Sequence, residues 1–250
     1  MIETLEVMTT PITESPIELG SLAQWAAASA TFLAVLVALF RDEIVRWWRK
    51  PKLTVSIALQ PPDCHKTTLD YRVQRTTLII GSAECYYLRL WVQNLGQTRA
   101  ESVQVFAANL SRRNADETFK QIESFLPMNL RWAHGQQRSG GPEIFAEGIS
   151  PGMGKHCDLG RVIDPAHHAN LGEELPGVGT GNSILALDLE VPPNTKSHLV
   201  SPGVYQLELR VAAANCIPVT KVIEITITGK WFAEQRQMFS DGLGIKVINK

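Results

Sequence analysis

The longest hydrophobic stretch of the chain lies near its N-terminus and contains very few polar residues. From Leu19 to Phe40 the sequence reads LGSLAQWAAASATFLAVLVALF, and residues 21–40 carry no charge. About 20 helical residues, at a rise of roughly 1.5 Å each, span the hydrocarbon layer of a bilayer. The pattern therefore predicts one transmembrane helix, which together with a basic juxtamembrane segment occupies residues 19–50.

Three other structures are weighed for this stretch. A secretory signal peptide starts with basic residues and ends in a small-residue cleavage site, whereas this start is acidic and Arg41 follows the apolar run. A buried core helix of this length usually shows a polar stripe, and an interfacial helix has a charged face. A transmembrane helix fits the pattern better than any of them.

After Pro51 the pattern changes to the two-residue alternation that is typical of β-strands. Alternation is clear in 204–212, where Tyr205 and Leu207 share one face while Gln206 and Glu208 share the other. Strands are predicted at 52–59, 86–94, 102–108, 183–191, 204–212 and 219–228. Seven to nine strands with polar turns between them predict an antiparallel β-sandwich over residues 51–250.

Two segments depart from this alternation. The long middle, 111–182, is rich in glycine and predicts loops or an inserted subdomain. After Gly229, hydrophobic and polar residues recur at helical spacing: Trp231, Gln235, Met238 and Phe239. We expect a short C-terminal helix that packs on the sandwich, followed by a short strand at 245–248.

Part of this pattern resembles a known family. The stretch LRLWVQNLGQTRAESVQVFAANL (88–110) looks like the strand–turn–strand unit of bacterial immunoglobulin-like domains of the CARDB type, and SPGVYQLELRV (201–211) is similar to a late strand of such sandwiches. The whole layout resembles uncharacterised bacterial single-pass membrane proteins. The resemblance implies a mainly β fold, with one N-terminal transmembrane helix, an antiparallel immunoglobulin-like β-sandwich and a short C-terminal helix. It implies no activity.

Charge is distributed unevenly around the apolar stretch and predicts its orientation. Residues 1–20 carry four acidic and no basic residues, whereas residues 41–52 carry five basic and two acidic residues. Basic residues close to a membrane stay on its cytoplasmic side. We expect a short acidic extracytoplasmic tail at 1–18, and a cytosolic domain at 51–250 attached to the bacterial inner membrane.

Two groups of residues in the helix are candidates for contact with lipid or with a second helix. Aromatic and basic side chains near its ends are typical of the membrane interface: Trp25, Arg46, Trp47, Trp48, Arg49 and Lys50. Alanines at every fourth position share one face: Ala26, Ala30, Ala34 and Ala38. Small residues at this spacing let membrane helices approach closely. The predicted partner is therefore the bilayer. Association with a second copy of the chain is a hypothesis, and the favoured alternative is that alanine is simply common in membrane helices.

The remainder of the chain is electrically balanced. After residue 52 it carries nineteen basic and nineteen acidic residues, which argues against a broad nucleic-acid surface. Four cysteines are widely spaced without a C-x-x-C motif: Cys64, Cys85, Cys157 and Cys216. We expect free thiols in a reducing compartment, with two disulfides as the alternative.

Candidate metal ligands and acid–base groups are present but scattered. Cys64–His65, His156–Cys157 and the nearby His167–His168 offer the sulfur and imidazole that zinc prefers. Neighbours on a strand point to opposite faces, however, and short chelate spacings are absent. We therefore expect no metal and no cofactor. Asp158, Asp164, Glu173 and Glu174 are acids near His167, but an acid–base role requires a cleft.

Two further segments are candidate ligand contacts. Gly177-Val-Gly179-Thr-Gly181 lacks the Lys-Ser/Thr of a phosphate loop and indicates a surface turn. Arg131, Trp132 and His134 combine bases with an aromatic ring and are possible contacts for an anionic ligand such as a nucleotide, although the pattern favours a solvated loop.

The sequence lacks the Gly-x-Ser-x-Gly and His-Glu-x-x-His motifs of hydrolases. It therefore favours a non-enzymatic, membrane-anchored binding or interaction module for an unknown protein or small-molecule ligand. One alternative is an oligomeric membrane effector, in which the sandwich senses a signal and the helices assemble to disrupt the bilayer, as in bacterial defence. The other alternative is a Cys/His metal-binding protein.

Overall fold

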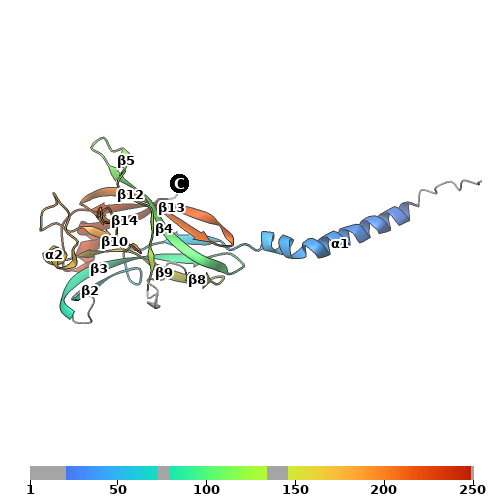
Figure 1. Cartoon of the computed structure of the whole chain (residues 1–250), viewed down its shortest axis with the longest axis horizontal. Helices are drawn as coiled ribbons and strands as arrows, with labels where there is room; N and C mark the ends of the chain where they lie inside the picture. The colour runs from blue at the N-terminus through green and yellow to red at the C-terminus, as the bar shows by residue number, and fades with distance from the viewer. Residues whose placement is uncertain (1–20, 73–78, 134–145, 249–250) are drawn as a thin grey trace, which may run out of the picture. The chain divides into compact units, whose positions relative to one another are not determined.

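The computed structural model describes residues 21–72, 79–133 and 146–248, with the side chains of 44–48, Arg72 and Glu147 left out. The chain divides into two compact units, Met1–Trp48 and Arg49–Lys250. Each unit is described by itself, and Figure 1 traces both.

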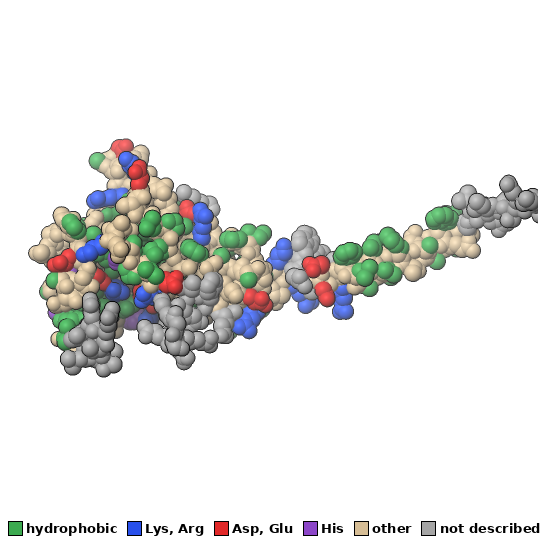
Figure 2. All heavy atoms as spheres, viewed as in Figure 1, with side chains coloured by type: hydrophobic (Ala, Val, Ile, Leu, Met, Phe, Trp, Pro, Cys, Tyr) green, Lys and Arg blue, Asp and Glu red, His purple; other side chains and the backbone are tan. Residues whose placement is uncertain are grey.

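The first unit contains one helix, α1 (Leu22–Trp48). At its start the Gln24 side chain accepts a hydrogen bond from the Ser21 amide at 2.9 Å, and the Ser21 carbonyl accepts from the Trp25 amide at 3.2 Å. This arrangement satisfies polar groups that a helix end leaves free. Over Leu22–Glu43 the mean hydropathy is 1.8, so this one helix of the described residues is long and apolar enough to cross a membrane. Figure 2 shows hydrophobic side chains following the helix, with charged side chains near its C-terminal end.

The second unit is built from two antiparallel sheets. The first sheet has the order β1 (Leu53–Ser56), β3 (Ile79–Asn94), β9 (Gly154–Ile163), β10 (Leu185–Leu187) and β11 (Leu199–Val200). Two more strands join it at its flanks: β2 (Cys64–Arg72) pairs with β3, and β7 (Arg131–Trp132) pairs with β9.

The second sheet has the order β14 (Leu243–Ile248), β13 (Cys216–Ile227), β12 (Gly203–Ala213), β4 (Ala100–Arg113) and β5 (Phe119–Gln121). Two short strands also pair with β4: β6 (Met128–Asn129) and β8 (Ala146–Ile149). Because β4 continues β3 across a short turn, consecutive strands connect the two sheets (Figure 1).

One hydrophobic core joins the sheets. On β3 the alternate residues Leu88, Leu90 and Val92 are buried, and they belong to the same cluster as Leu207 and Ile225 of the other sheet. The predicted mainly β fold of two antiparallel sheets is therefore confirmed. The four cysteines are free thiols, three of them buried, as expected. Burial raises the pKa of the Cys64 thiol to about 12 and that of Cys85 to about 11.

The C-terminal helix is also present. It comprises α3 (Gln235–Gln237) and a π-helical turn, η2 (Met238–Gly242). Glu234 caps α3 by accepting hydrogen bonds from two backbone amides, at 3.0 Å from Arg236 and 2.6 Å from Gln237. Met238 is fully buried in the sandwich core, as the helical spacing predicts.

The middle of the chain differs from the prediction of loops or an inserted subdomain. Strand β9 lies inside the first sheet, between β3 and β10, and so belongs to the sandwich itself. Its outward residues are charged or polar, and Gly160 interrupts the alternation. A side chain at Gly160 would lie 2.4 Å from the Ala186 carbonyl oxygen, so the close approach of β10 requires glycine there. The strand predicted at 183–191 is reduced to β10.

Candidate functional site

A cavity of about 860 Å³ lies beside a short helical segment that follows β9. This segment comprises the 3₁₀ turn η1 (Pro165–His167) and α2 (His168–Leu171). The opposite walls are the loop 172–182 and Trp231. The lining combines apolar side chains, among them Leu175, Val178 and Ile184, with four titratable ones: Asp164, His168, Glu174 and Lys196.

Hydrogen bonds hold the loop 172–182 in place at both ends. Gly172 ends α2 in a left-handed conformation (φ 69°), and its amide donates to the Ala169 carbonyl. At the other end the Ser183 amide donates to the Gly229 carbonyl at 2.7 Å. Between these points Leu175 and Val178 pack against a small buried cluster: Ile184, Ala186 and Leu199. The loop is thus a packed wall of the cavity.

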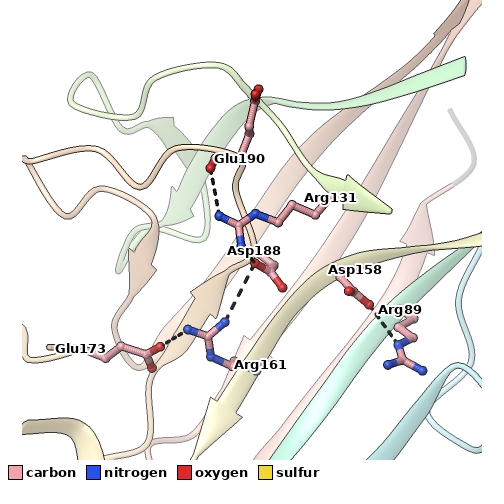
Figure 3. Close-up of polar contacts among 7 residues, drawn as sticks. All are labelled: Arg89, Arg131, Asp158, Arg161, Glu173, Asp188 and Glu190. Carbon is pink, nitrogen blue, oxygen red and sulfur yellow. Dashed lines mark hydrogen bonds and ion pairs between the residues drawn. The ribbon is translucent and has the colours of Figure 1, made fainter. Parts of the chain in front are cut away.

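An ion-pair network supports the same loop from the outer face of the first sheet (Figure 3). Arg161 on β9 pairs with Glu173, and its second guanidinium nitrogen lies 3.9 Å from Asp188. Asp188 also lies 3.7 Å from Arg131, which donates to the Glu190 carbonyl at 2.9 Å. Burial raises the pKa of Glu173 even though the Arg161 charge opposes that shift. Nearby, Arg89 and Asp158 form another ion pair at 2.9 Å.

His168 is the buried titratable residue of the cavity wall. Its ring hydrogen-bonds to the backbone of Ile163, while Nε2 has no hydrogen-bond partner in the described part of the chain. Desolvation lowers the pKa of His168 despite this bond and the nearby Asp164 and Glu174 charges. Nε2 is thus a buried ring nitrogen of the wall without a hydrogen-bond partner among the described residues.

A second cavity of about 540 Å³ shares a wall with the first. Both are lined by Leu175, Pro176, Val178 and Gly179, so this part of the loop separates them. The second cavity adds Arg112, whose guanidinium lies 5.8 Å from the centre of the Tyr205 ring. The glycine-rich segment 177–181, expected to be a surface turn, is therefore part of the walls of two hollows.

The possible ligand residues predicted from sequence lie elsewhere. Arg131 is held by Asp188 and Glu190, and Trp132 is buried in the core with Lys155 Nζ at 5.5 Å from its ring centre. His134 lies outside the described residues. The two described members of this trio thus support the fold, and neither lines the two cavities.

The Cys/His pairs do not form a ligand cluster. Cys64 and Cys157 are buried, and His156 Nε2 lies 3.0 Å from Asp63 Oδ1 beside the Trp91 ring. No group of three His, Cys, Asp or Glu side chains within the described residues is placed to hold a metal ion.

The candidate membrane residues all fall on α1 or directly after it. The alanine face, Ala26, Ala30, Ala34 and Ala38, lies within one uninterrupted helix and is exposed. Trp25 is 60% exposed near the helix start, and Arg49 and Lys50 are exposed after its end. The side chains of Arg46, Trp47 and Trp48 lie outside the described set.

The four acids that the sequence places near His167 fall into two groups in the structure. Asp164 and Glu174 line the cavity, whereas Asp158 and Glu173 are paired with arginines. Lys196 and Trp231 also line it, although they lie far from 164–181 in the sequence. These segments are brought together by the pairing register of β9, β10 and β13. A local sequence pattern does not reveal that register.

No family model matches this chain, and no curated protein or solved structure matches it either. The resemblance to CARDB-type domains stays a prediction.

Proposed function

We propose that this chain is a membrane-anchored β-sandwich that binds a ligand without catalysis, and that the cavity beside α2 is its binding site. The observation that carries the proposal is the cavity itself, whose volume of about 860 Å³ lies in the usual range for ligand sites. Its wall combines apolar side chains with a few polar groups, as such sites do.

The described lining favours a small organic ligand with an apolar part and a polar edge. Leu175, Val178 and Ile184 offer the apolar surface, and Asp164, Glu174 and Lys196 offer the polar edge.

The proposed location is the bacterial inner membrane, with residues 1–18 outside and 51–250 in the cytoplasm. One helix of sufficient length and hydropathy supports the anchor. Four acids before that helix and five bases after it support the orientation.

A cavity-filling substitution tests the binding site. Full-length protein in nanodiscs would be screened by thermal shift against a library of nucleotides, amino acids, sugars and organic acids. A ligand that binds only the folded state raises Tm, and the stabilisation grows with the logarithm of one plus the ratio of the free ligand concentration to Kd. Ala169 is exposed and lines the cavity, so Ala169→Trp should abolish the ligand-induced shift.

The matched control is Asn170→Trp, which adds the same ring at the next exposed position, outside the lining. This variant should keep the shift. Loss of the shift in both variants, retention in both, or a library without any binder would each contradict the proposed site.

A second candidate function is the assembling membrane effector. The observation that favours it is the exposed alanine face of α1, which continues over three turns of one helix. In this function, ligand binding in the sandwich would control association of the helices.

A further inference from the structure

Hydrogen bonds join four segments at one end of the sandwich: 49–52, 94–101, 148–155 and 211–219. We name this surface the linker end, because it contains the residues that follow α1. Thr98 Oγ1 donates to the Arg49 carbonyl at 2.7 Å, and the Lys52 amide donates to Asn94 Oδ1 at 3.1 Å. The Asn94 amide donates to the Met153 carbonyl at 2.9 Å.

The β12–β13 turn belongs to the same surface. Its Asn215 accepts from the Glu101 amide at 3.1 Å and donates to the Arg99 carbonyl at 2.8 Å. Hydrogen bonds between side chains and backbone groups therefore connect the turns of the linker end to their neighbours.

Three large apolar side chains project from these turns. Leu95 is 55% exposed, Met153 is 62% exposed and Ile217 is 77% exposed. Leu95 and Met153 lie on two of these turns, and Ile217 follows the β12–β13 turn as the second residue of β13. Single exposed apolar residues are ordinary on a protein surface. Three on adjoining turns of one end call for a partner that accepts apolar side chains.

The charge of the linker end identifies that partner. Its four segments contain five basic residues, namely Arg49, Lys50, Lys52, Arg99 and Lys155, and one acidic residue, Glu101. The chain after residue 52 is otherwise balanced, so positive charge is concentrated here. Apolar side chains surrounded by bases are the combination that an anionic lipid surface attracts.

The covalent chain keeps this surface close to such a membrane. The apolar span ends at Glu43, and only five residues separate it from Arg49. Even fully extended, six residue steps cover about 20 Å. Docking the linker end therefore costs little loss of freedom once α1 is inserted.

We propose that the linker end docks on the anionic surface of the bilayer that anchors α1, with Leu95, Met153 and Ile217 entering the headgroup region. The proposal rests on membrane anchorage by α1 but is independent of ligand binding in the cavity. In this proposal the linker end is a second point of attachment to the membrane, in addition to α1.

A fluorescence quenching experiment tests the docking. A dye is attached to Ser150→Cys, an exposed position of the linker end, in a Cys216→Ser background, because the other three cysteines are buried. Full-length protein is reconstituted in vesicles that carry nitroxide-labelled headgroups. We expect strong quenching in phosphatidylglycerol-containing vesicles, and loss of that quenching in pure phosphatidylcholine or at high salt.

The control dye sits on Lys120→Cys, exposed on β5 near the opposite end of β4. Strand β4 has 14 residues, so this position lies about 40 Å away along the strand and should stay unquenched in both lipids.

Variants separate docking from the effect of the tether. Replacing Leu95, Met153 and Ile217 by Ser, or Arg49 and Lys52 by Glu, should reduce quenching to the level in phosphatidylcholine. Ile80→Ser, which changes an apolar residue that is 59% exposed at the far end of β3, and Lys120→Glu should leave it unchanged.

Two outcomes would overturn the proposal. If quenching at position 150 is the same in both lipids and in all of these variants, the tether alone holds the domain near the bilayer. If it instead follows the protein-to-lipid ratio, the linker end contacts a second copy of the chain. Ligand-induced thermal shifts are unaffected by either result, so the two proposals fail separately.

Discussion

The Asn94 side chain is fully buried and forms four hydrogen bonds with backbone groups of three segments. Its Oδ1 accepts from the Lys52 and Gly96 amides at 3.1 and 2.9 Å. Its Nδ2 donates to the Thr98 and Ile149 carbonyls at 2.7 and 2.9 Å. A single amide thus joins the start of the domain to the β3–β4 turn and to the end of β8.

Asn94→Ala would leave these four backbone groups without that partner. A buried polar group that loses its partner costs about 1–3 kcal/mol, and water at this end of the domain offsets part of the loss. We expect the free energy of unfolding to fall by about 3 kcal/mol. Urea unfolding of the full-length protein in detergent, followed by tryptophan fluorescence, measures it.

The neighbouring Gln93→Ala is the control, because the Gln93 side chain donates one long hydrogen bond, at 3.4 Å to the Gly152 carbonyl. Its expected cost is under about 1 kcal/mol. Equal costs for the two variants would contradict the special role of Asn94.

Asn94 and Trp132 illustrate which contacts the sequence predicts and which it does not. The Asn94-Leu-Gly96 turn follows from local chemistry, and it is present. The contacts of Asn94 with Lys52 and Ile149 span 42 and 55 positions, so no local pattern contains them. Trp132 illustrates the reverse case, because a ring beside bases in a glycine-rich region suggested a surface, whereas β7 buries it in the core.

At the scale of elements, strands with one apolar face were predictable and strands with polar interruptions were not. Strands β12 and β13 alternate cleanly, and their buried residues are the predicted ones, Leu207 and Ile223 among them. Strand β9 carries Lys155, His156 and Asp158, with glycine at 160, so its central place in the sheet depends on pairing with β3 and β10. The cavity could not be predicted either, because its lining residues come from segments that only the strand pairing brings together.

Helix α1 supports a prediction about self-association. Ala30→Leu with Ala34→Leu would enlarge the small face and keep two helices from approaching closely. We expect a clear loss of dimerisation signal in a membrane two-hybrid assay, with insertion unchanged because leucine is at least as apolar as alanine.

The matched control pair is Ala28→Leu with Val35→Leu. Successive helical residues are 100° apart, so these positions lie on the other side of α1. An equal loss in both pairs, or none in either, would show that the alanine face does not mediate association.

At the scale of the whole molecule, charge and thiol chemistry each bear on the proposed cytoplasmic location. The bases after the apolar span are the basis of the proposal that the C-terminal unit is cytoplasmic. Free thiols at Cys64, Cys85, Cys157 and Cys216 suit a reducing environment. These two properties are independent, since one concerns insertion and the other the chemistry of the folded domain.

The last prediction concerns orientation. Green fluorescent protein fused after Lys250 should fluoresce, and alkaline phosphatase fused at the same point should be inactive, because the first reporter requires the cytoplasm and the second the periplasm. Replacing Glu14 and Glu18 by Lys, together with Arg41, Arg46 and Arg49 by Gln, removes the charge asymmetry and should produce a mixed population. Phosphatase activity with the native sequence would show that the domain is outside. The linker end would then meet the outer leaflet of the membrane, and the quenching experiment would still report whether its bases recognise anionic lipid.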